Sequence, residues 1–218
     1  MHPTLTRRTE AGRQFPVLVW HLDRPLLAIS TAVLGGGLGP RRWVINTKVP
    51  IGYDRSDPDA HLAEIARELE LEGPGVGLMT AVDVADRVHG SDGGVHVTAT
   101  VGLGSPGWAA APDGHLRRES RSRYAVPEPG TVNIVATLPV RLSEAALVNA
   151  VATATEAKAQ ALWELGVAAT GTATDAVCLL CPIDGEAAPY GGPRSTWGAR
   201  LARAVHAAVL QGGRAELR

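Results

Sequence analysis

One continuous stretch, residues 142–182, constrains the fold of this chain more than any other part of its 218 residues. Its pattern predicts a long helix, then a loop rich in glycine and threonine, then an apolar strand. Ser143 is a favourable residue before a helix and Gly166 a favourable residue after one, which gives a helix of about six turns. A long helix joined by a short loop to a buried strand indicates helices packed on a sheet.

One charged residue lies within the apolar face of this helix. At about 100° per residue, Lys158 falls in the middle of a stripe of aliphatic side chains. Either its methylene stem packs while its ammonium reaches water, or the ammonium is desolvated and paired with a carboxylate. Asp175, at the junction of the loop and the apolar strand, is the expected partner. The stripe consists of Leu147, Val151, Ala154, Ala161, Leu162 and Leu165.

The opposite face of the helix and the loop after it hold further polar candidates. The helix has a polar row that either lines a cleft or faces solvent, consisting of Asn149, Thr153, Glu156 and Gln160. In the loop, backbone amides and short hydroxyl side chains can approach a ligand beside glycine. A plain turn, in which Thr and Asp side chains bond to their own backbone, is the alternative. The loop residues concerned are Thr170, Gly171, Thr172 and Thr174.

The remaining segments predict one α/β domain of the α+β type over residues 1–218. We expect a mixed β-sheet sandwich, with one sheet or two short ones, on which the long central helix and the C-terminal helix pack. A further helix opens at Asp57-Pro58. Residues 1–14 could be disordered, and residues 102–130 form a long loop. The expected strands cover residues 15–21 and 26–34, which are neighbours separated by a turn, and 42–49, 75–82, 95–101, 131–138 and 176–181.

Composition argues against several partners. A net charge of −1 gives no electrostatic reason to bind nucleic acid or an anionic membrane. The most apolar early segment, residues 26–34, is far shorter than the roughly 20 residues of a membrane helix. No signal-peptide pattern precedes it, so we expect a cytoplasmic protein without nucleic acid or membrane as a partner.

The cysteines and histidines do not form a recognisable metal motif. Cys178 and Cys181 have a spacing that occurs in redox and metal sites, but residues three apart in a strand point to opposite faces. Two buried structural thiols are the favoured interpretation. The seven histidines contain no compact ligand pattern, although a metal held by distant residues stays open.

Each polar residue at the end of another expected element has both a structural and a functional interpretation. Asp83 follows a buried strand and is a ligand, a catalytic acid or the cap of the next turn. Ser195 and Thr196 begin the last helix, where free amides could receive a carbonyl or an anion, or Ser195 simply caps the helix. The glycine cluster at 34–39 fits a flexible or ligand-approaching loop better than a nucleotide site. The long loop also carries Arg117, Arg118, Arg121 and Arg123, which are solvated or contact an acidic ligand.

A series of short motifs runs in a fixed order through most of the chain: Ile29-Ser30-Thr31 with the glycines that follow, Asn46 before Val49-Pro50, residues 75–81, 130–134, 147–150, 155–158 and 170–175, and Gly192-Pro193 leading to Gly198 and residues 203–205. In this order the series resembles the adenosylcobinamide amidohydrolase family. The chain departs from the pattern at residues 102–108, GLGSPGW, where the resemblance would place an Asn-containing turn.

The resemblance implies hydrolysis of the amide that joins 1-amino-2-propanol to a corrin-ring propionate in adenosylcobinamide. Asp175 would be the base or orienting group, with Glu156 as the second candidate, and Lys158 would keep Asp175 ionised or donate to the oxyanion. Thr172 or Thr174 could supply a hydroxyl nucleophile, although water activated by the base is preferred. Asn133 and Asn149 would bind corrin amides. The implied substrate-binding residues are Ser30, Thr31, Gly36, Asn46, Thr80, Asp83, Asn133, Asn149, Thr170, Gly171, Ser195 and Thr196.

The resemblance also sets the expected partners. A corrinoid is the ligand, its cobalt arrives within the substrate, and no cofactor of the protein's own is expected. The oligomeric state stays open, homo-oligomers included. Two other functions stay open as well: a corrinoid-binding or sensing protein without turnover, and a self-activating amidase whose N-terminal nucleophile would require cleavage before a Ser or Thr.

Overall fold

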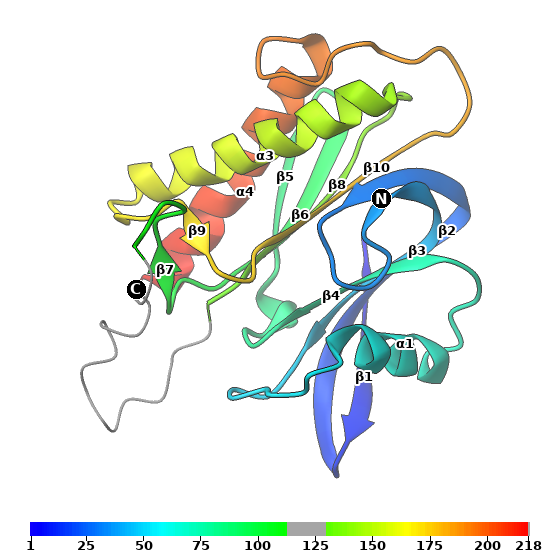
Figure 1. Cartoon of the computed structure of the whole chain (residues 1–218), viewed down its shortest axis with the longest axis vertical. Helices are drawn as coiled ribbons and strands as arrows, with labels where there is room; N and C mark the ends of the chain where they lie inside the picture. The colour runs from blue at the N-terminus through cyan, green and yellow to red at the C-terminus, as the bar shows by residue number, and fades with distance from the viewer. Residues whose placement is uncertain (113–129, 218) are drawn as a thin grey trace.

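The computed structural model describes residues 1–112 and 130–217 (Figure 1). The four arginines of the long loop lie outside the described residues. Within the described part, no helix is both long enough and apolar enough to cross a membrane.

An eight-stranded mixed sheet forms the centre of the described chain. The β3–β4 and β8–β10 pairs are parallel, and the other neighbouring strands are antiparallel. In spatial order the strands are β4 (Gly75–Thr80), β3 (Gly37–Lys48), β2 (Arg13–Ser30), β10 (Ala176–Cys181), β8 (Val132–Thr137), β6 (Val95–Val101) and β5 (Val88–Asp92), with β1 (Thr4–Glu10) paired to β2. A separate small ladder joins β7 (Pro106–Gly107) to β9 (Gly171–Thr172).

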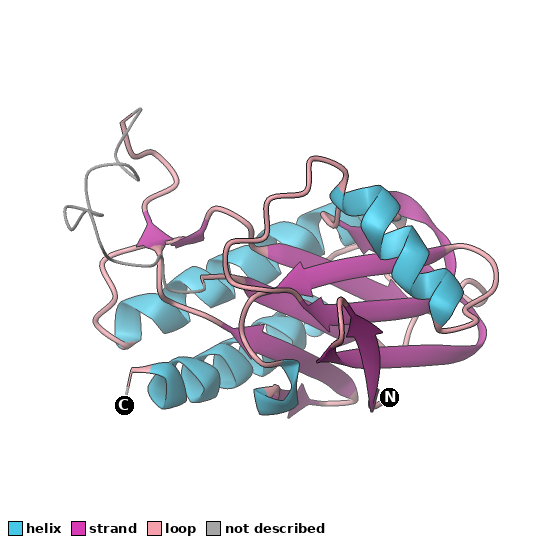
Figure 2. Ribbon diagram, turned by 90° about the horizontal axis from the view of Figure 1, so that it is seen from below, coloured by secondary structure: helices cyan, strands magenta, loops and turns pink. Residues whose placement is uncertain are grey.

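Helices cover both sides of the sheet. The long helices α3 (Glu144–Glu164) and α4 (Thr196–Glu216) pack against one another and on the half that contains β5, β6, β8 and β10. The shorter α1 (Pro58–Glu68) packs on the outer side of β2, β3 and β4, and the single turn η1 (Val84–Asp86) follows β4. Figure 2 shows the sheet between α1 and the two long helices. This confirms the expected α/β architecture with the central and C-terminal helices on the sheet.

Besides the apolar clusters under the long helices and under α1, a third apolar cluster lies between the strands. Alternate residues of β10 illustrate the division, because Leu179 faces the long helices while Cys178 and Leu180 face a cluster built from strands and η1. Cys178 and Cys181 are both buried free thiols and belong to different clusters, as the strand spacing predicted. Burial raises the pKa of Cys178 to about 12, so a structural thiol fits this position better than a reactive one.

The local start and stop signals of the central helix are confirmed. Ser143 caps α3 by accepting a hydrogen bond from the Ala146 N–H at 3.1 Å. Gly166, just past the end, has φ +76°, a conformation that favours glycine. The strands expected at 95–101 and 176–181 are present with these bounds, and those expected at 75–82 and 131–138 are present but slightly shorter.

Two expectations for the N-terminal half are wrong, and one strand there was not anticipated. Residues 15–34 do not form two adjacent strands: β2 is one strand of 18 residues with an irregularity in its register with β3 between His21 and Leu26. That irregularity accommodates Pro25, which has no N–H for a ladder. Residues 1–14, expected to be disordered, contain β1. Pairing with β2 satisfies the backbone hydrogen bonds of β1, although its polar sequence gives little local signal for a strand. β5 was also not expected; it joins β6 through Gly93 and Gly94, both with positive φ.

Candidate active site

A buried ion pair joins the central helix to the bend before β10. The ammonium of Lys158 hydrogen-bonds to Oδ2 of Asp175, and the two side chains are 8% and 11% exposed. The periodicity of α3 aims Lys158 at the sheet, and the alternation of β10 turns Asp175 towards the same side. The pairing of these two residues, expected from the apolar stripe, is present.

Asp175 accepts four hydrogen bonds within the described residues. Besides Lys158, its donors are the backbone N–H of Val132 at 2.7 Å, the N–H of Thr172 at 3.0 Å and the hydroxyl of Thr172 at 2.5 Å. Two donors reach each carboxylate oxygen, which uses the roughly four lone-pair positions of the group. The carboxylate therefore connects β8, β9 and α3, and Thr172 supplies the one hydroxyl among these four donors.

Gly171 makes room for this arrangement. A Cβ at this position would collide with Lys158 Nζ and with Asp175 Oδ2. The φ of Gly171 is not in the left-handed region, so this glycine is required by the close approach of two side chains to the backbone.

Further threonine hydroxyls surround the bend. Thr174 donates to the carbonyl of Gly130 at 3.2 Å, so the 2.5 Å bond between Thr131 and Thr174 has Thr131 as its donor. Thr170 accepts from the N–H of Ala109 at 2.9 Å. The bend is thus lined by hydroxyls and fixed to the strand ends on either side.

A second polar cluster occupies the strand-built core. Asn133 donates to the Asn46 side-chain carbonyl and to the backbone carbonyl of Met79, each at 3.0 Å, and Asn46 donates to the Thr100 hydroxyl at 3.0 Å. All three side chains belong to residues that are at most 2% exposed. Asn133 follows Val132, whose N–H binds Asp175, so the amide cluster and the ion pair flank the start of β8 on opposite faces.

Lys48 and Asp83 form a more exposed pair at the ends of β3 and β4. Their charged atoms are 3.0 Å apart, and both residues line a cavity of about 440 Å³. Asp83 also caps η1 by accepting from the Ala85 N–H at 2.9 Å. Partial burial opposes ionisation of Asp83, but the bonds from Ala85 and Lys48 outweigh it and lower its pKa. Thr80, nearby, is buried and its hydroxyl accepts from the Val82 N–H at 3.2 Å.

Ser30 and Thr31 hold the start of β10 in place. The Ser30 hydroxyl donates to the carbonyl of Val177 at 3.0 Å, and the Thr31 hydroxyl accepts from the Val177 N–H at 3.0 Å. Gly36 follows, where a Cβ would collide with the carbonyl oxygen of Ala32. These residues fix the backbone two positions after Asp175.

Four of the expected residues belong neither to the ion pair nor to the clusters described above. Glu156 and Asn149 are exposed on the outer face of α3. Ser195 caps α4 through the Gly198 N–H at 3.1 Å and donates to the Gly192 carbonyl at 2.8 Å, and Thr196 beside it is exposed. The buried member of the polar row is Thr153, which donates to the Gly191 carbonyl at 2.9 Å.

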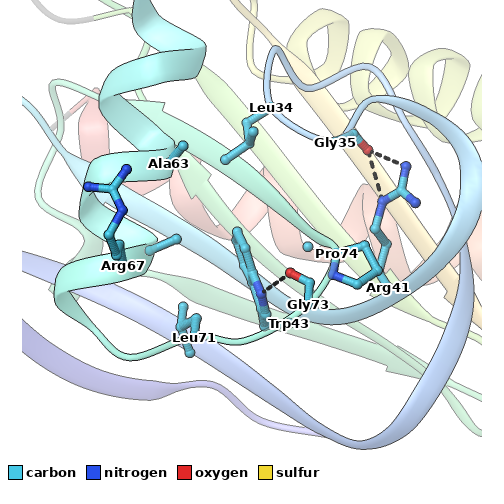
Figure 3. Close-up of a pocket in the computed structure, with 11 residues that line it drawn as sticks. Leu34, Gly35, Arg41, Trp43, Ala63, Arg67, Leu71, Gly73 and Pro74 are labelled. Atoms are coloured by element: carbon cyan, nitrogen blue, oxygen red, sulfur yellow. Dashed lines mark hydrogen bonds between the residues drawn. The ribbon is translucent and has the colours of Figure 1, made fainter.

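Another cavity, of about 580 Å³, lies between α1 and the sheet (Figure 3). Trp43 lies at its centre, with its indole N–H donating to the Gly73 carbonyl at 3.1 Å, and Arg41 and Arg67 extend on either side. The described residues that line it include no carboxylate and no hydroxyl. It therefore supplies neither a base nor a nucleophile.

Two residues of these clusters were not singled out from the sequence. Thr100 was interpreted only as part of an alternating strand, and Thr131 only as the start of one. Each acquires its partner from a segment more than 40 residues away, so local pattern contains no signal for it. In the described residues, no group of three or more His, Cys, Asp or Glu side chains is arranged to hold a metal ion.

A carboxylate, an ammonium and several hydroxyls at one bend are the components of an acyl-transfer site, in which a nucleophile, a proton acceptor and a cation meet. Comparison with known proteins agrees with that class. The model of the adenosylcobinamide amidohydrolase family matches residues 2–218. The chain belongs to this family.

Two relatives carry the same name. The adenosylcobinamide amidohydrolase of Methanosarcina mazei is 31% identical over 194 residues, which cover 85% of this chain and 88% of the relative. That of Halobacterium salinarum is 42% identical over 119 residues, 54% of this chain and 49% of the relative. Among solved structures, a Pyrococcus horikoshii protein has a TM-score of 0.48 at 13% identity, covering 91% of this chain and 77% of its own, which is too low to bear on function.

Proposed function

We propose that this chain hydrolyses the amide between 1-amino-2-propanol and a corrin-ring propionate of adenosylcobinamide, giving adenosylcobyric acid for corrinoid salvage. Its membership of the family along residues 2–218 carries the proposal. The ion pair of Lys158 and Asp175 at a hydroxyl-lined bend supports it, because amide hydrolysis needs a nucleophile, a proton acceptor and a proton donor for the leaving amine.

Thr172 is the nucleophile in this proposal. Its hydroxyl already points at Asp175 Oδ1, 2.5 Å away, so its oxygen lone pairs face away from the carboxylate. A water molecule activated by Asp175 is less favoured by this geometry, because four donors occupy the carboxylate. Thr172 would attack the amide carbon while its proton moves to Asp175.

Lys158 completes the reaction. As the C–N bond breaks, its ammonium gives a proton to the leaving nitrogen, and aminopropanol departs. Water then attacks the ester on Thr172, its proton returns to Lys158, and the Thr172 oxygen recovers its proton from Asp175. The sum is amide plus water giving acid plus amine, and the enzyme ends as it began. Cobalt enters only as part of the corrinoid.

Release of aminopropanol from adenosylcobinamide tests the proposal. Asp175→Asn and Thr172→Ala should each lower kcat by about 10²-fold or more, whereas Thr172→Ser should keep a substantial part of the activity. Glu156→Gln is the matched control for Asp175→Asn, because it makes the same chemical change on the exposed face of α3. Circular dichroism of each variant separates lost chemistry from lost folding.

Intact mass distinguishes the nucleophiles. Quenching the reaction early should show a chain heavier by the corrinoid acyl group, attached at Thr172 in peptide maps. Unchanged turnover of Thr172→Ala would instead assign the attack to water. A chain that binds adenosylcobinamide tightly and releases no amine would be a binding or sensing protein, and a chain shortened before a Ser or Thr would indicate self-activation.

The proposal places the enzyme in the cytoplasm with a corrinoid as its ligand and no nucleic acid partner. The two buried thiols, neither in a disulfide, are consistent with a reducing compartment. Cell fractionation tests the location, and sedimentation of the purified chain gives its oligomeric state.

A further inference from the structure

We infer that Trp108 and the turn after it form the binding surface for the corrin ring, beside the bend that carries Thr172 and Asp175. This inference rests on the proposed function. It concerns the segment 102–108 that departs from the family pattern, and it assigns that segment a specificity-determining role.

Backbone pairing fixes Trp108 next to the reactive bend. In the β7–β9 ladder, Pro106 is opposite Thr172 and Gly107 is opposite Gly171. The Thr170 N–H donates to the Gly107 carbonyl at 3.0 Å. Trp108 directly follows Gly107. It therefore lies close in space to Gly171 and Thr172, although more than 60 positions separate them in the sequence.

The cavity beside Trp108 has an aromatic and mostly apolar lining that suits a flat, uncharged ligand group. Its volume is about 430 Å³, and the described residues that line it are Trp108, Ala109, Ala110, Ala111, Pro112 and Thr170. None of these side chains is charged, and Thr170 is the polar one among them. Trp108 is 45% exposed, so part of its side chain is accessible to a ligand.

An exposed indole over small residues binds planar conjugated groups by stacking. The conjugated part of the corrin macrocycle is such a group, and the amides at its edge could hydrogen-bond to hydroxyls such as that of Thr170. Ring contact at Trp108 would hold the propionate amide over Thr172 without using the charged pair for binding. The adenine of the upper ligand is also planar, and the experiment below distinguishes the two.

The test measures binding and turnover for two cobinamides, one with an adenosyl and one with a cyano upper ligand. Trp108→Ala should weaken binding of both by a similar factor, about tenfold, in equilibrium dialysis. In turnover it should raise KM with little change in kcat, and Trp108→Phe should restore most of the affinity. Trp163→Ala is the matched control, because that indole is 73% exposed on α3, and its affinity should equal that of the parent chain.

Three results would overturn the inference. Unchanged affinity of Trp108→Ala for both cobinamides would remove Trp108 from the ligand surface. A loss confined to the adenosyl compound would place adenine, not the ring, on the indole. An equal loss for Trp163→Ala would make the effect unspecific. The dialysis does not need turnover, so weakened binding by Trp108→Ala in a chain that releases no amine would refute the proposed hydrolysis and leave this inference standing.

Discussion

Asn133 of β8 donates a 3.0 Å hydrogen bond to Asn46 of β3, although β2 and β10 lie between these strands in the order of the sheet. A flat sheet would keep the two strands well over 10 Å apart at the usual spacing of about 4.8 Å per strand. The sheet must therefore curl until its two halves face each other. The amide pair lies in the strand-built core that this curl encloses.

Asn133→Ala should lower the free energy of unfolding by about 1–3 kcal/mol, because it leaves the Asn46 oxygen and the Met79 carbonyl without their donor in a buried place. Urea unfolding measures the loss. Asn149→Ala, the same change at an exposed position, should alter stability by less than about 0.5 kcal/mol. Equal effects of the two substitutions would contradict the importance of the buried pair.

Removing one member of the ion pair should be worse than removing both charges. Lys158→Met leaves the buried Asp175 carboxylate without its cation and should cost about 3–5 kcal/mol. The double variant Lys158→Met with Asp175→Asn should be more stable than Lys158→Met alone, because no uncompensated charge remains. Urea unfolding of the parent, both single variants and the double variant completes the cycle. A double variant that is less stable than Lys158→Met would show that the pair contributes by means other than charge compensation.

Gly171→Ala should abolish most turnover by pushing Lys158 away from Asp175, since the added Cβ occupies their space. Gly166→Ala is the control. It has open space around the position but a φ of +76°, so it should cost about 1 kcal/mol of stability and leave turnover close to that of the parent. Amine release and thermal unfolding are measured on both. Full activity of Gly171→Ala would show that the close approach is dispensable.

Stability should fall as the pH drops below about 6.5, partly through His61. Burial lowers the pKa of this imidazole and outweighs the opposite influence of Glu10. Between the unfolded value of about 6.5 and the lower folded value, the unfolded chain binds more protons, so acid favours unfolding there. Urea unfolding at several pH values should show a shallower decline for His61→Gln than for the parent. His21→Gln, at an exposed position, should keep the parent's decline.

Sequence pattern captured the features that depend on neighbours along the chain. The limits of α3 follow from Ser143 and Gly166, and the direction of Lys158 follows from helical period, so its pairing with Asp175 could be anticipated. The outward direction of Glu156 follows from the same period. Whether that outer face lined a cleft could not be decided, because exposure depends on segments elsewhere.

Features that depend on distant segments were not available from the sequence. The contact of Asn46 with Asn133 needs the curl of the sheet, and the partner of Thr131 needs the position of the bend. β1 and the continuity of β2 were missed for a similar reason, because pairing between strands overrides weak local propensity. Asp83 shows the intermediate case: its capping role is local, but its pairing with Lys48 is not.

The pairing of β2 with β10 has a consequence for biosynthesis. Residues 27–30 pair with residues 178–181, so a nascent chain on the ribosome exposes an unpaired sheet edge until residue 181 has been synthesised. Contacts of such long range also slow the search for the native state. Truncated products that end before residue 176 should therefore be prone to aggregate, because β2 then lacks its neighbour β10.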